Sequence, residues 1–386
     1  MKILVTAASY SSHISGVQRH AFNMVRCLLL RPEISMVHLV LAPWQREMVQ
    51  ASGLILDSRL TVHYAEMGRG SIARNFWYYR KLPKLVAQLQ PDLVHLSYPM
   101  PVDTAALGCP TVLTLHDLYP YEIPSNFGLH RSLFNRGILW HCMKNVDAIA
   151  CVSDTTMARL KQYAPDKLRR KAIRIYNCVE PESQCATQSP LPGWNGEPFL
   201  LSIAQHRRNK NIPLLIRSFN RLLRQKQIHP ATRLVVLGVQ GPETQRIRKA
   251  VSHCGLQNSV LFLEGLSQAE LQWCYSRSEA VVLPSETEGF GLPVAEALLA
   301  GCRVVCSDIP AFREICRGDC EFVSLRADAE SALAAGIVTA LHRPAQEPVT
   351  LPRLSAEVLA KEYARLYRGL IPGVATKKSV VCAASI

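Results

Sequence analysis

The sequence predicts an α/β protein with two doubly wound parallel sheets that face each other across a cleft. Short β-rich runs alternate with longer helical segments along the whole chain. A stretch rich in proline and glycine, residues 181–197, divides this alternation into two halves. The chain has 386 residues, more than a single hydrophobic core usually serves. Alternating strands and helices build parallel sheets covered on both faces, with ligands at the carboxyl ends of the strands.

The first half, residues 1–180, is expected to form an amino-terminal Rossmann-like domain. Its strands are short apolar runs bounded by polar or turn residues. The expected strands are Lys2–Thr6, Val37–Leu41, Leu93–Leu96, Thr111–Leu115, Ala148–Val152 and Ile173–Ile175. The expected helices between them are Val17–Leu30, Ile72–Leu89, Ser132–Lys144 and Thr155–Tyr163.

The second half, residues 198–355, repeats the pattern as a carboxyl-terminal Rossmann-like domain. The expected strands are Phe199–Ile203, Arg233–Leu237, Val260–Leu263, Ala280–Leu283 and Arg303–Cys306. The expected helices are Ile212–Gln225, Glu243–Cys254, Gln268–Ser276 and Pro293–Ala300. A last helix, Ala356–Tyr367 within 356–371, is expected to pack back toward the amino-terminal domain, followed by a flexible tail, 372–386.

The balance of charges limits the partners of the protein. Lys and Arg number 44 against 30 Asp and Glu, which gives a net charge of +14. Such a charge suits nucleic acid, an anionic membrane surface or a phosphorylated small substrate, and the alternative is a generally basic surface without such a partner. The chain carries no helix-turn-helix, zinc-finger or RNA-binding aromatic pattern, so no nucleic acid is expected. No apolar run approaches the ~18 residues of a membrane span, and we expect a cytoplasmic protein.

Thirteen scattered cysteines fit reduced thiols. A cluster of four, Cys302, Cys306, Cys316 and Cys320, raises the alternative of a zinc site. However, Cys302 and Cys306 lie on one expected strand, where four residues span ~13 Å, too far for two sulfurs that share one ion. We therefore expect buried thiols and no metal.

The segment 285–297, Ser-Glu-Thr-Glu-Gly-Phe-Gly-Leu-Pro-Val-Ala-Glu-Ala, joins an apolar strand to a helix. Gly289 and Gly291 allow close approach of the backbone to a ligand, and a helix entrance attracts phosphate. Pro293 suits the first turn of the helix, and Gly301 suits the left-handed position after its end. Carboxylates on either side would accept hydrogen bonds from sugar hydroxyls; the alternative is that both are solvated surface acids.

This segment resembles the signature of the retaining GT-B glycosyltransferases of family 4 (glycosyl transferases group 1). The resemblance rests on two glutamates, Glu288 and Glu296, with Gly-Phe-Gly-Leu-Pro between them, followed by Gly301 and Ser307. It implies that Glu296 holds the nucleotide ribose and that Glu288 lies near hydroxyls of the donor sugar. The residues between them that would meet the sugar and phosphate are Gly289, Phe290, Gly291 and Leu292.

A basic loop follows the first strand of the second half. Cations between a strand and a helix can neutralise two phosphates. Lys210-Asn211 matches a pair that the family carries here, whereas Gln205 stands where the family has arginine. Arg207 or Arg208 would then contact the diphosphate, and we favour Arg207 as the catalytic cation beside Lys210. The alternative is a solvated basic turn.

Three further positions follow from the resemblance. His116 directly follows the strand Thr111–Leu115, where family members carry a histidine beside the donor sugar; the alternative is a histidine with a structural hydrogen bond. Gly16 resembles a glycine at the family's helix entrance and would let the loop close over phosphate or acceptor; the alternative is that it only begins a helix. Leu266 belongs to a loop that faces the base, and its backbone contacts would not reveal which base is bound.

The segment 74–84, Arg-Asn-Phe-Trp-Tyr-Tyr-Arg-Lys-Leu-Pro-Lys, combines aromatic and basic residues. It would either lie against lipid headgroups or form domain core with a basic edge. Four consecutive aromatic residues spread around a helix, which favours the core.

These expectations combine into one function. The chain would move a hexose-like sugar from a nucleotide-diphosphate sugar to a hydroxyl acceptor, a glycan or lipid-linked glycan of the cell envelope or an exopolysaccharide. By the resemblance, the anomeric configuration is retained. We expect no cofactor and no metal, because no Asp-x-Asp pair is placed to carry one. The protein would be cytoplasmic, with peripheral attachment to an anionic membrane. The alternatives are a nucleotide-sugar epimerase and a non-catalytic nucleotide-sugar-binding protein.

Overall fold

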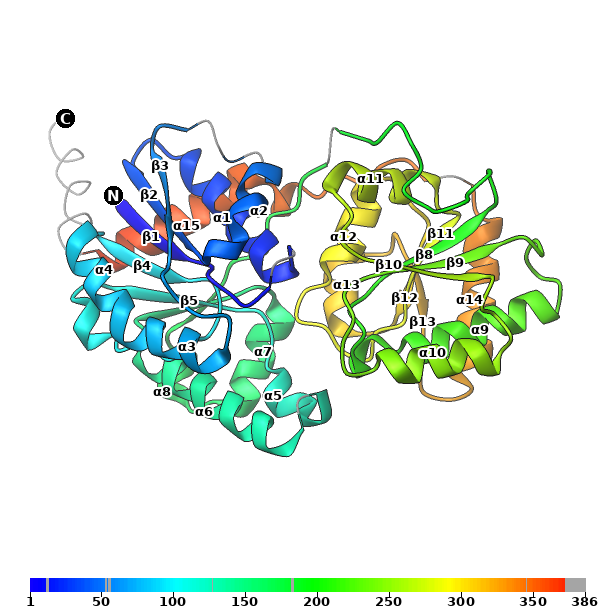
Figure 1. The fold of residues 1–386 in the computed structure, drawn as a ribbon, viewed down its shortest axis with the longest axis horizontal. Helices are drawn as coiled ribbons and strands as arrows, with labels where there is room; N and C mark the ends of the chain where they lie inside the picture. Colours follow the sequence, from blue (N-terminus) through cyan, green and yellow to red (C-terminus); the bar gives the residue numbers. More distant parts are fainter. Residues whose placement is uncertain are drawn as a thin grey trace, which may run out of the picture. The chain divides into compact units, whose positions relative to one another are not determined.

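Two parallel sheets with helices on both faces form the framework of the protein, as the sequence predicts (Figure 1). The computed structural model describes residues 1–11, 14–52, 54, 57–126, 128–181, 184–344 and 346–371. The expected tail, 372–386, lies outside the described residues. One compact unit contains Met1–Tyr121, His130–Cys178 and the chain from Pro352, and the other contains Glu122–Leu129 and Val179–Leu351.

The sheet of the first unit has the strand order β3-β2-β1-β4-β5-β6-β7, with every pair parallel. Its central strands are almost wholly buried because helices cover both faces, which explains their continuous apolar runs. The strands are β1 Lys2–Thr6, β2 Met36–Leu41, β3 Leu60–Tyr64, β4 Leu93–Leu96, β5 Thr111–Leu115, β6 Ala148–Cys151 and β7 Ala172–Arg174.

The helices of the first unit connect these strands and include the last helix of the chain. They are α1 Gly16–Leu29, α2 Arg46–Ala51, α3 Ser71–Phe76, α4 Leu82–Leu89, α5 Tyr119–Glu122, α6 Leu129–Asn145, α7 Asp154–Tyr163, α8 Asp166–Arg169 and α15 Ala356–Leu370. Short 3-10 turns of this unit are η1 Pro43–Gln45, η3 Ala105–Leu107 and η6 Pro352–Leu354, whereas η4 Pro124–Asn126, between α5 and α6, belongs to the second unit. A π-helical turn, η2 Trp77–Lys81, joins α3 to α4.

The sheet of the second unit has the order β10-β9-β8-β11-β12-β13 and is also parallel throughout. Figure 1 shows α9, α10 and α14 on one side of this sheet and α11, α12 and α13 on the other. The strands are β8 Phe199–Ile203, β9 Arg233–Leu237, β10 Val260–Leu263, β11 Ala280–Leu283, β12 Val304–Ser307 and β13 Glu321–Val323. The helical elements are η5 Arg208–Lys210, α9 Ile212–Arg224, α10 Thr244–His253, α11 Gln268–Arg277, α12 Leu292–Leu299, α13 Pro310–Cys316 and α14 Ala329–His342.

The expected helix Ile72–Leu89 forms, but not as one regular α-helix. A π-helical turn over Trp77–Lys81 precedes Pro83, the second residue of α4. Proline removes a backbone N–H and its ring crowds the preceding turn, and a wider turn accommodates both. Trp77 and Tyr78 are buried while Phe76 and Tyr79 are exposed, so the aromatic run divides between core and surface.

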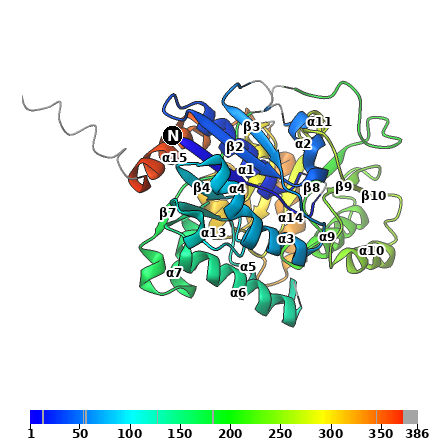
Figure 2. The ribbon, with the colours of Figure 1, turned by 60° about the vertical axis from the view of Figure 1, so that its left-hand side comes forward.

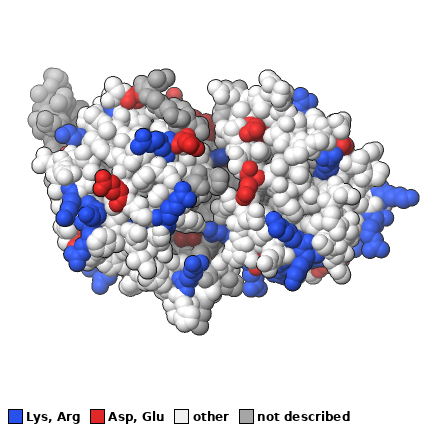
Figure 3. Space-filling view, viewed as in Figure 1, with Lys and Arg blue, Asp and Glu red and all other residues white. Residues whose placement is uncertain are grey.

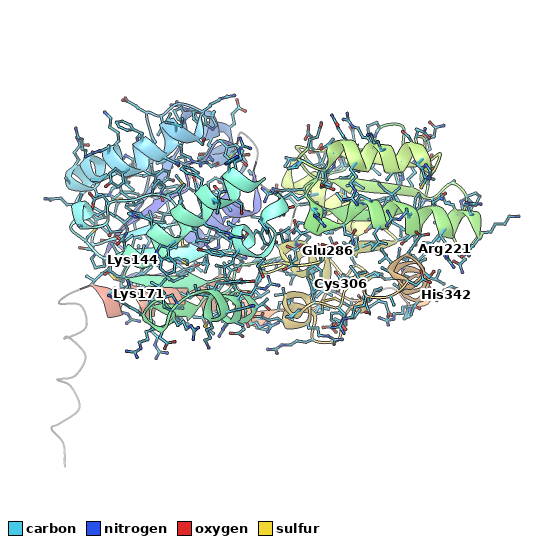
Figure 4. The ribbon with its side chains drawn as sticks, turned by 90° about the horizontal axis from the view of Figure 1, so that it is seen from below. Lys144, Lys171, Arg221, Glu286, Cys306 and His342 are labelled. Atoms are coloured by element: carbon cyan, nitrogen blue, oxygen red, sulfur yellow. A yellow bond between two sulfur atoms is a disulfide. The ribbon has the colours of Figure 1, made fainter. Side chains whose placement is uncertain are left out.

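The last helix packs on the first unit. In Figures 1 and 2, α15 lies beside α1, with α6 across the sheet from them. Its Tyr367 side chain is fully buried, and the Tyr367 hydroxyl lies 2.5 Å from Nδ1 of His95 on β4. At the end of α6, the Lys171 ammonium donates to the carbonyls of Lys144 at 3.0 Å and Val146 at 2.6 Å (Figure 4). A cation at this position satisfies carbonyls that the helix leaves unpaired.

The described part of the expected linker, 181–197, packs on the second unit. Ala186 donates its N–H to the carbonyl of Ala269 at 3.0 Å, and the Trp194 ring meets the Trp273 ring edge-on at 4.9 Å.

Among the described residues, no helix is long and apolar enough to cross a membrane.

Candidate active site

The second sheet reverses its strand order between β8 and β11, which lie side by side with Leu201 opposite Val281. Loops that leave such a pair at its carboxyl end open a crevice where ligands bind in parallel α/β sheets. The basic loop, 204–211, follows β8, and the glycine-containing loop, 284–291, follows β11. Topology therefore brings together two motifs that are some 80 residues apart in the sequence.

An ion pair joins the two loops. Lys210 Nζ lies 2.5 Å from Oε1 of Glu288, and both side chains are more than four-fifths buried. The Ser285 hydroxyl donates to the same oxygen at 2.7 Å, and the Ser307 hydroxyl donates to the Ser285 carbonyl. Shielding from water strengthens these charge-assisted bonds and fixes the position of the lysine.

The glycine-containing loop enters α12 through a residue that must be glycine. Gly291 has φ of 105°, and a Cβ there would lie 2.9 Å from the ring of Phe312 on α13. Leu292 begins the helix, with Pro293 in its first turn, and Gly301 after the helix has φ of 73°, both as predicted. Gly289 and Phe290 are buried where the partial positive charge of the helix entrance favours an anion.

Glu296 lies in α12 beside a second polar group. The Tyr275 hydroxyl on α11 donates to Oε2 of Glu296 at 2.8 Å. A small pocket borders this pair, lined by Glu296, Tyr275, Gln268, Gln272 and Leu299 among other residues. The structure therefore places Glu296 at a pocket rather than among solvated surface acids.

The remaining predicted residues of the second unit lie on the same loops or next to them. Arg207 is half-buried and Arg208 is exposed, and both precede Lys210 in the basic loop. Leu266 is half-buried in the loop after β10, directly after Gly265, which has φ of 76°.

His116 and Gly16 belong to the first unit. His116 follows β5, and its Nε2 donates to the Ser97 carbonyl at 2.8 Å. Burial lowers the pKa of His116 to about 4, so its imidazole is neutral at neutral pH and Nδ1 is a hydrogen-bond acceptor. Gly16 is the first residue of α1.

Two further histidines surround His116. The His20 ring meets the His116 ring edge-on at 4.8 Å, and Nε2 of His20 lies 3.2 Å from the Thr114 hydroxyl. Nε2 of His95 lies 2.7 Å from the same hydroxyl, and burial lowers the pKa of His95 to about 3.

The sequence does not reveal the residues that hold these side chains. Ser285 and Ser307 stand within quoted motifs but have no recognisable role there, because a serine on a strand end signals nothing by itself. Tyr275 lies 21 residues before Glu296 on a different helix, and only the packing of α11 beside α12 reveals the pair.

The expectation of reduced thiols is wrong for two cysteines. A disulfide joins Cys316, at the end of α13, to Cys320, just before β13, with their Cα atoms 5.8 Å apart. The tight turn between these elements brings the two side chains together. The sulfur of Cys306 lies within 4.8 Å of both, whereas the Cys302 thiol donates to the Tyr275 carbonyl at 3.2 Å. The four cysteines therefore do not gather round one point.

Comparison with known proteins identifies two family models along the chain. The model described as Glycosyltransferase Family 4 matches residues 14–183, and the model described as Glycosyl transferases group 1 matches residues 188–348.

Two curated relatives share about a quarter of their aligned residues with this chain. The O-antigen chain mannosyltransferase RfbU of Salmonella typhimurium is 28% identical over 204 residues, which cover 53% of this chain and 53% of the relative. The O-antigen chain mannosyltransferase B of Escherichia coli is 25% identical over 260 residues, which cover 65% of this chain and 66% of the relative. The chain thus spans about half to two thirds of the length of these relatives.

Solved structures share the fold. WaaG, a glycosyltransferase involved in lipopolysaccharide biosynthesis, superposes with a TM-score of 0.64 at 16% identity, covering 96% of this chain and 100% of that one. Anabaena HepE in complex with UDP and glucose gives 0.64 at 16% identity, covering 96% and 95%. These likenesses confirm the predicted GT-B fold class. Because the two family models together match nearly all of residues 14–348, the chain belongs to family 4 of the glycosyltransferases, the glycosyl transferases group 1.

Proposed function

We propose that this protein transfers a hexose from a nucleotide-diphosphate sugar to a hydroxyl acceptor, with retention of the anomeric configuration. The observation that carries the proposal is the Lys210–Glu288 ion pair next to the Gly289–Gly291 turn, at the point where the second sheet reverses its strand order. A cation, a helix entrance and a carboxylate meet there, and a second carboxylate, Glu296, lies farther along α12, which suits a ligand with phosphates at its centre and hydroxyls at its ends.

Each side chain then has a task. Lys210, Arg207 and the entrance of α12 neutralise the diphosphate, and Glu296 accepts hydrogen bonds from the ribose. Glu288 and, by the family resemblance, His116 hold the donor sugar. The neutral His116 imidazole offers Nδ1 as an acceptor to a sugar hydroxyl.

The chemistry follows from these tasks. Fixed cations stabilise the negative charge that develops on the departing diphosphate, and orientation of the acceptor hydroxyl supplies the rest of the acceleration. Since the chain itself supplies positive charge at the diphosphate, we propose that the transfer needs no metal.

The names of two relatives support a choice of donor sugar. RfbU and mannosyltransferase B carry names that specify mannose transfer to O-antigen chains. We therefore propose a mannose donor and, as acceptor, a lipid-linked glycan of the cell envelope.

A lipid-linked acceptor suggests attachment to the inner face of an anionic membrane. On the segment 72–84, Ile72, Phe76 and Tyr79 are exposed, with 86%, 58% and 38% of their surfaces accessible. Arg80, Lys81 and Lys84 are exposed in the same segment. Apolar side chains with adjacent cations suit a bilayer surface. On the face seen in Figure 3, other basic side chains are spread over both units with acidic ones among them.

The function is tested with a panel of nucleotide sugars, GDP-mannose first, incubated with crude cell-envelope acceptors and chelator, with mass-spectrometric detection. We expect glycosylated acceptor and free nucleoside diphosphate, with the α-anomer formed from an α-linked donor. Lys210→Ala and Glu296→Ala should each weaken donor binding, whereas Lys226→Ala, an exposed lysine after α9, should not. Isomerised sugar without acceptor would indicate an epimerase, and binding without turnover a non-catalytic protein.

Membrane attachment is tested by sedimentation with vesicles of phosphatidylglycerol and of phosphatidylcholine. Phe76→Ser should lower binding to the anionic vesicles several-fold. Phe134→Ser, at an equally exposed phenylalanine on α6, is the matched control. Equal binding to both kinds of vesicle would contradict the proposal.

A further inference from the structure

A short segment between β5 and α6 joins the second unit. Glu122–Leu129 belongs to that unit, although the residues before and after it in the sequence belong to the first. Its turn η4, Pro124–Asn126, contacts η5, Arg208–Lys210, which carries the lysine of the ion pair.

Two buried amide side chains form this contact. Asn126 is 9% exposed and Asn209 is fully buried. Oδ1 of Asn126 accepts from the Arg208 N–H at 3.3 Å, and Nδ2 of Asn126 donates to Oδ1 of Asn209 at 3.2 Å. One amide thus binds both a backbone group and a side chain of the basic turn.

Asn209 extends the connection to the loop after β11. Nδ2 of Asn209 donates to the Thr287 carbonyl at 3.2 Å. The backbone carbonyl of Asn209 accepts from the N–H of Glu286, a residue labelled in Figure 4, at 2.8 Å. Asn126 and Asn209 therefore connect three segments that are far apart in the sequence. These segments are η4, the basic turn that carries Lys210, and the loop after β11 that carries Glu288.

The basic turn needs such support because it has little regular structure of its own. It is a single 3-10 turn that ends at Asn211 with φ of 53°. The 2.5 Å separation of Lys210 Nζ and Glu288 Oε1 requires the two loops to keep a fixed spacing. Without the Asn126 side chain, the Arg208 N–H and Oδ1 of Asn209 each lose a hydrogen bond in a low-dielectric environment. We then expect the turn to shift toward other partners.

We propose that Asn126 is a positioning residue of the donor site: through Asn209 it holds the basic turn against the loop after β11 and so sets Lys210 relative to Glu288. The inference rests on the proposed function, since it assigns Asn126 to the placement of the cation that would meet the diphosphate. It also gives the segment between β5 and α6 a part in donor binding that no motif indicates.

The test measures the dissociation constants of GDP and UDP by calorimetry on the full chain. Asn126→Ala should raise the dissociation constant of the nucleotide that binds roughly tenfold, and Asn258→Ala, at an exposed asparagine before β10, should leave it unchanged. In a Lys210→Gln background, Asn126→Ala should change the constant less than twofold, because the group that it positions is gone.

The outcomes separate the inference from the function on which it rests. If Lys210→Gln weakens nucleotide binding and Asn126→Ala does not, or if Asn126→Ala acts equally in both backgrounds, the positioning role is wrong and the proposed function stands. If Lys210→Gln itself leaves binding unchanged, the donor site and the inference both fail. Asn126→Ser, which keeps a hydroxyl, supplies the same comparison if the alanine variant does not fold.

Discussion

The Tyr275 hydroxyl fixes one carboxylate oxygen of Glu296 at 2.8 Å, and this bond limits the rotamers of a side chain that we assign to the ribose. A hydrogen bond to a charged group contributes about 1.5–3 kcal/mol. Tyr275→Phe keeps the ring and removes only the donor. We expect the dissociation constant of the nucleoside diphosphate to rise by about 3–10-fold while kcat at saturating donor changes little, because a positioned ribose affects binding more than chemistry.

The matched control for Tyr275→Phe is Tyr163→Phe, at a tyrosine on α7 in the first unit whose ring stacks on Tyr121. It loses a hydroxyl in the same way but touches none of the donor-site residues. Nucleotide affinities that are equal for Tyr275→Phe and the unmodified protein would remove Tyr275 from the site, whatever the effect on thermal stability.

At the residue scale the sequence singles out the candidate residues more readily than the bonds between them. Lys210, Glu288 and Glu296 are recognisable because glycines and a helix entrance accompany them at fixed spacing. Their direct bonds to Ser285, Tyr275 and each other depend on which loops the sheet topology brings together. A hydroxyl or an amide 20 to 80 residues away has no periodic pattern that would reveal such a contact.

At the element scale, Gly291 links the helix entrance to α13. An alanine there would adopt φ near 105°, which costs a residue with a Cβ about 1–2 kcal/mol, and its Cβ would also meet the Phe312 ring at 2.9 Å. Gly291→Ala should therefore lower the free energy of unfolding and also raise the donor KM, because the loop must move away from Phe312. Denaturant titration and steady-state kinetics measure the two effects.

Gly318→Ala distinguishes strain from collision. Gly318 has φ of 113°, but a Cβ there meets nothing within 4 Å. Gly318→Ala should lower the free energy of unfolding through backbone strain similar to that in Gly291→Ala and should leave the donor KM unchanged. Adding Phe312→Leu to Gly291→Ala should recover part of the KM; a KM that stays raised would show that backbone strain alone displaces the loop.

Burial explains part of the agreement between predicted and observed elements. Central strands such as Leu93–Leu96 and Thr111–Leu115 are predicted with the right bounds, because burial on both faces produces an unmistakable apolar run. The sequence does not predict the edge strands β3 and β13, which have half-exposed residues, although it predicts the edge strands β7 and β10. Nor does it predict α14, whose sequence is apolar with small residues all round and contains Gly336. Such a segment lacks the amphipathic stripe of a surface helix.

At the scale of the whole molecule, the chain returns to its first unit at the end. α15 packs on α1 and places Tyr367 against His95, so a chain of hydrogen bonds runs from Tyr367 through His95 and Thr114 to His20. This chain connects the last helix to α1, β4 and β5, elements that carry or border His20 and His116. Since Tyr367 and His95 are 272 residues apart, only the complete fold explains why both are buried polar groups.

The buried histidines make the stability of the protein depend on pH. Burial lowers the pKa of His95 to about 3 and of His116 to about 4, and it lowers the pKa of His20 well below its usual value, while in the unfolded chain each titrates near 6.5. Below pH ~6.5 the unfolded state binds protons that the native state does not, so the free energy of unfolding falls as the pH drops toward 4. Between pH 7.5 and 5.5 we expect a loss of about 1 kcal/mol for each such histidine, measured by denaturant titration at both pH values.

His95→Gln isolates one of these contributions. The glutamine can still bond Thr114 or Tyr367 but cannot take up a proton, so the loss of stability between pH 7.5 and 5.5 should shrink by about 1 kcal/mol. His253→Gln, at an exposed histidine that ends α10, should leave the loss unchanged. If His95→Gln and the unmodified protein lose the same free energy of unfolding between pH 7.5 and 5.5, His95 takes up a proton in the native state as readily as in the unfolded chain. A titration of the imidazole resonances would then show a midpoint near 6.5 instead of 3. In that case a charged imidazole between Thr114 and Tyr367 would replace the neutral chain of hydrogen bonds that ties α15 to the first unit.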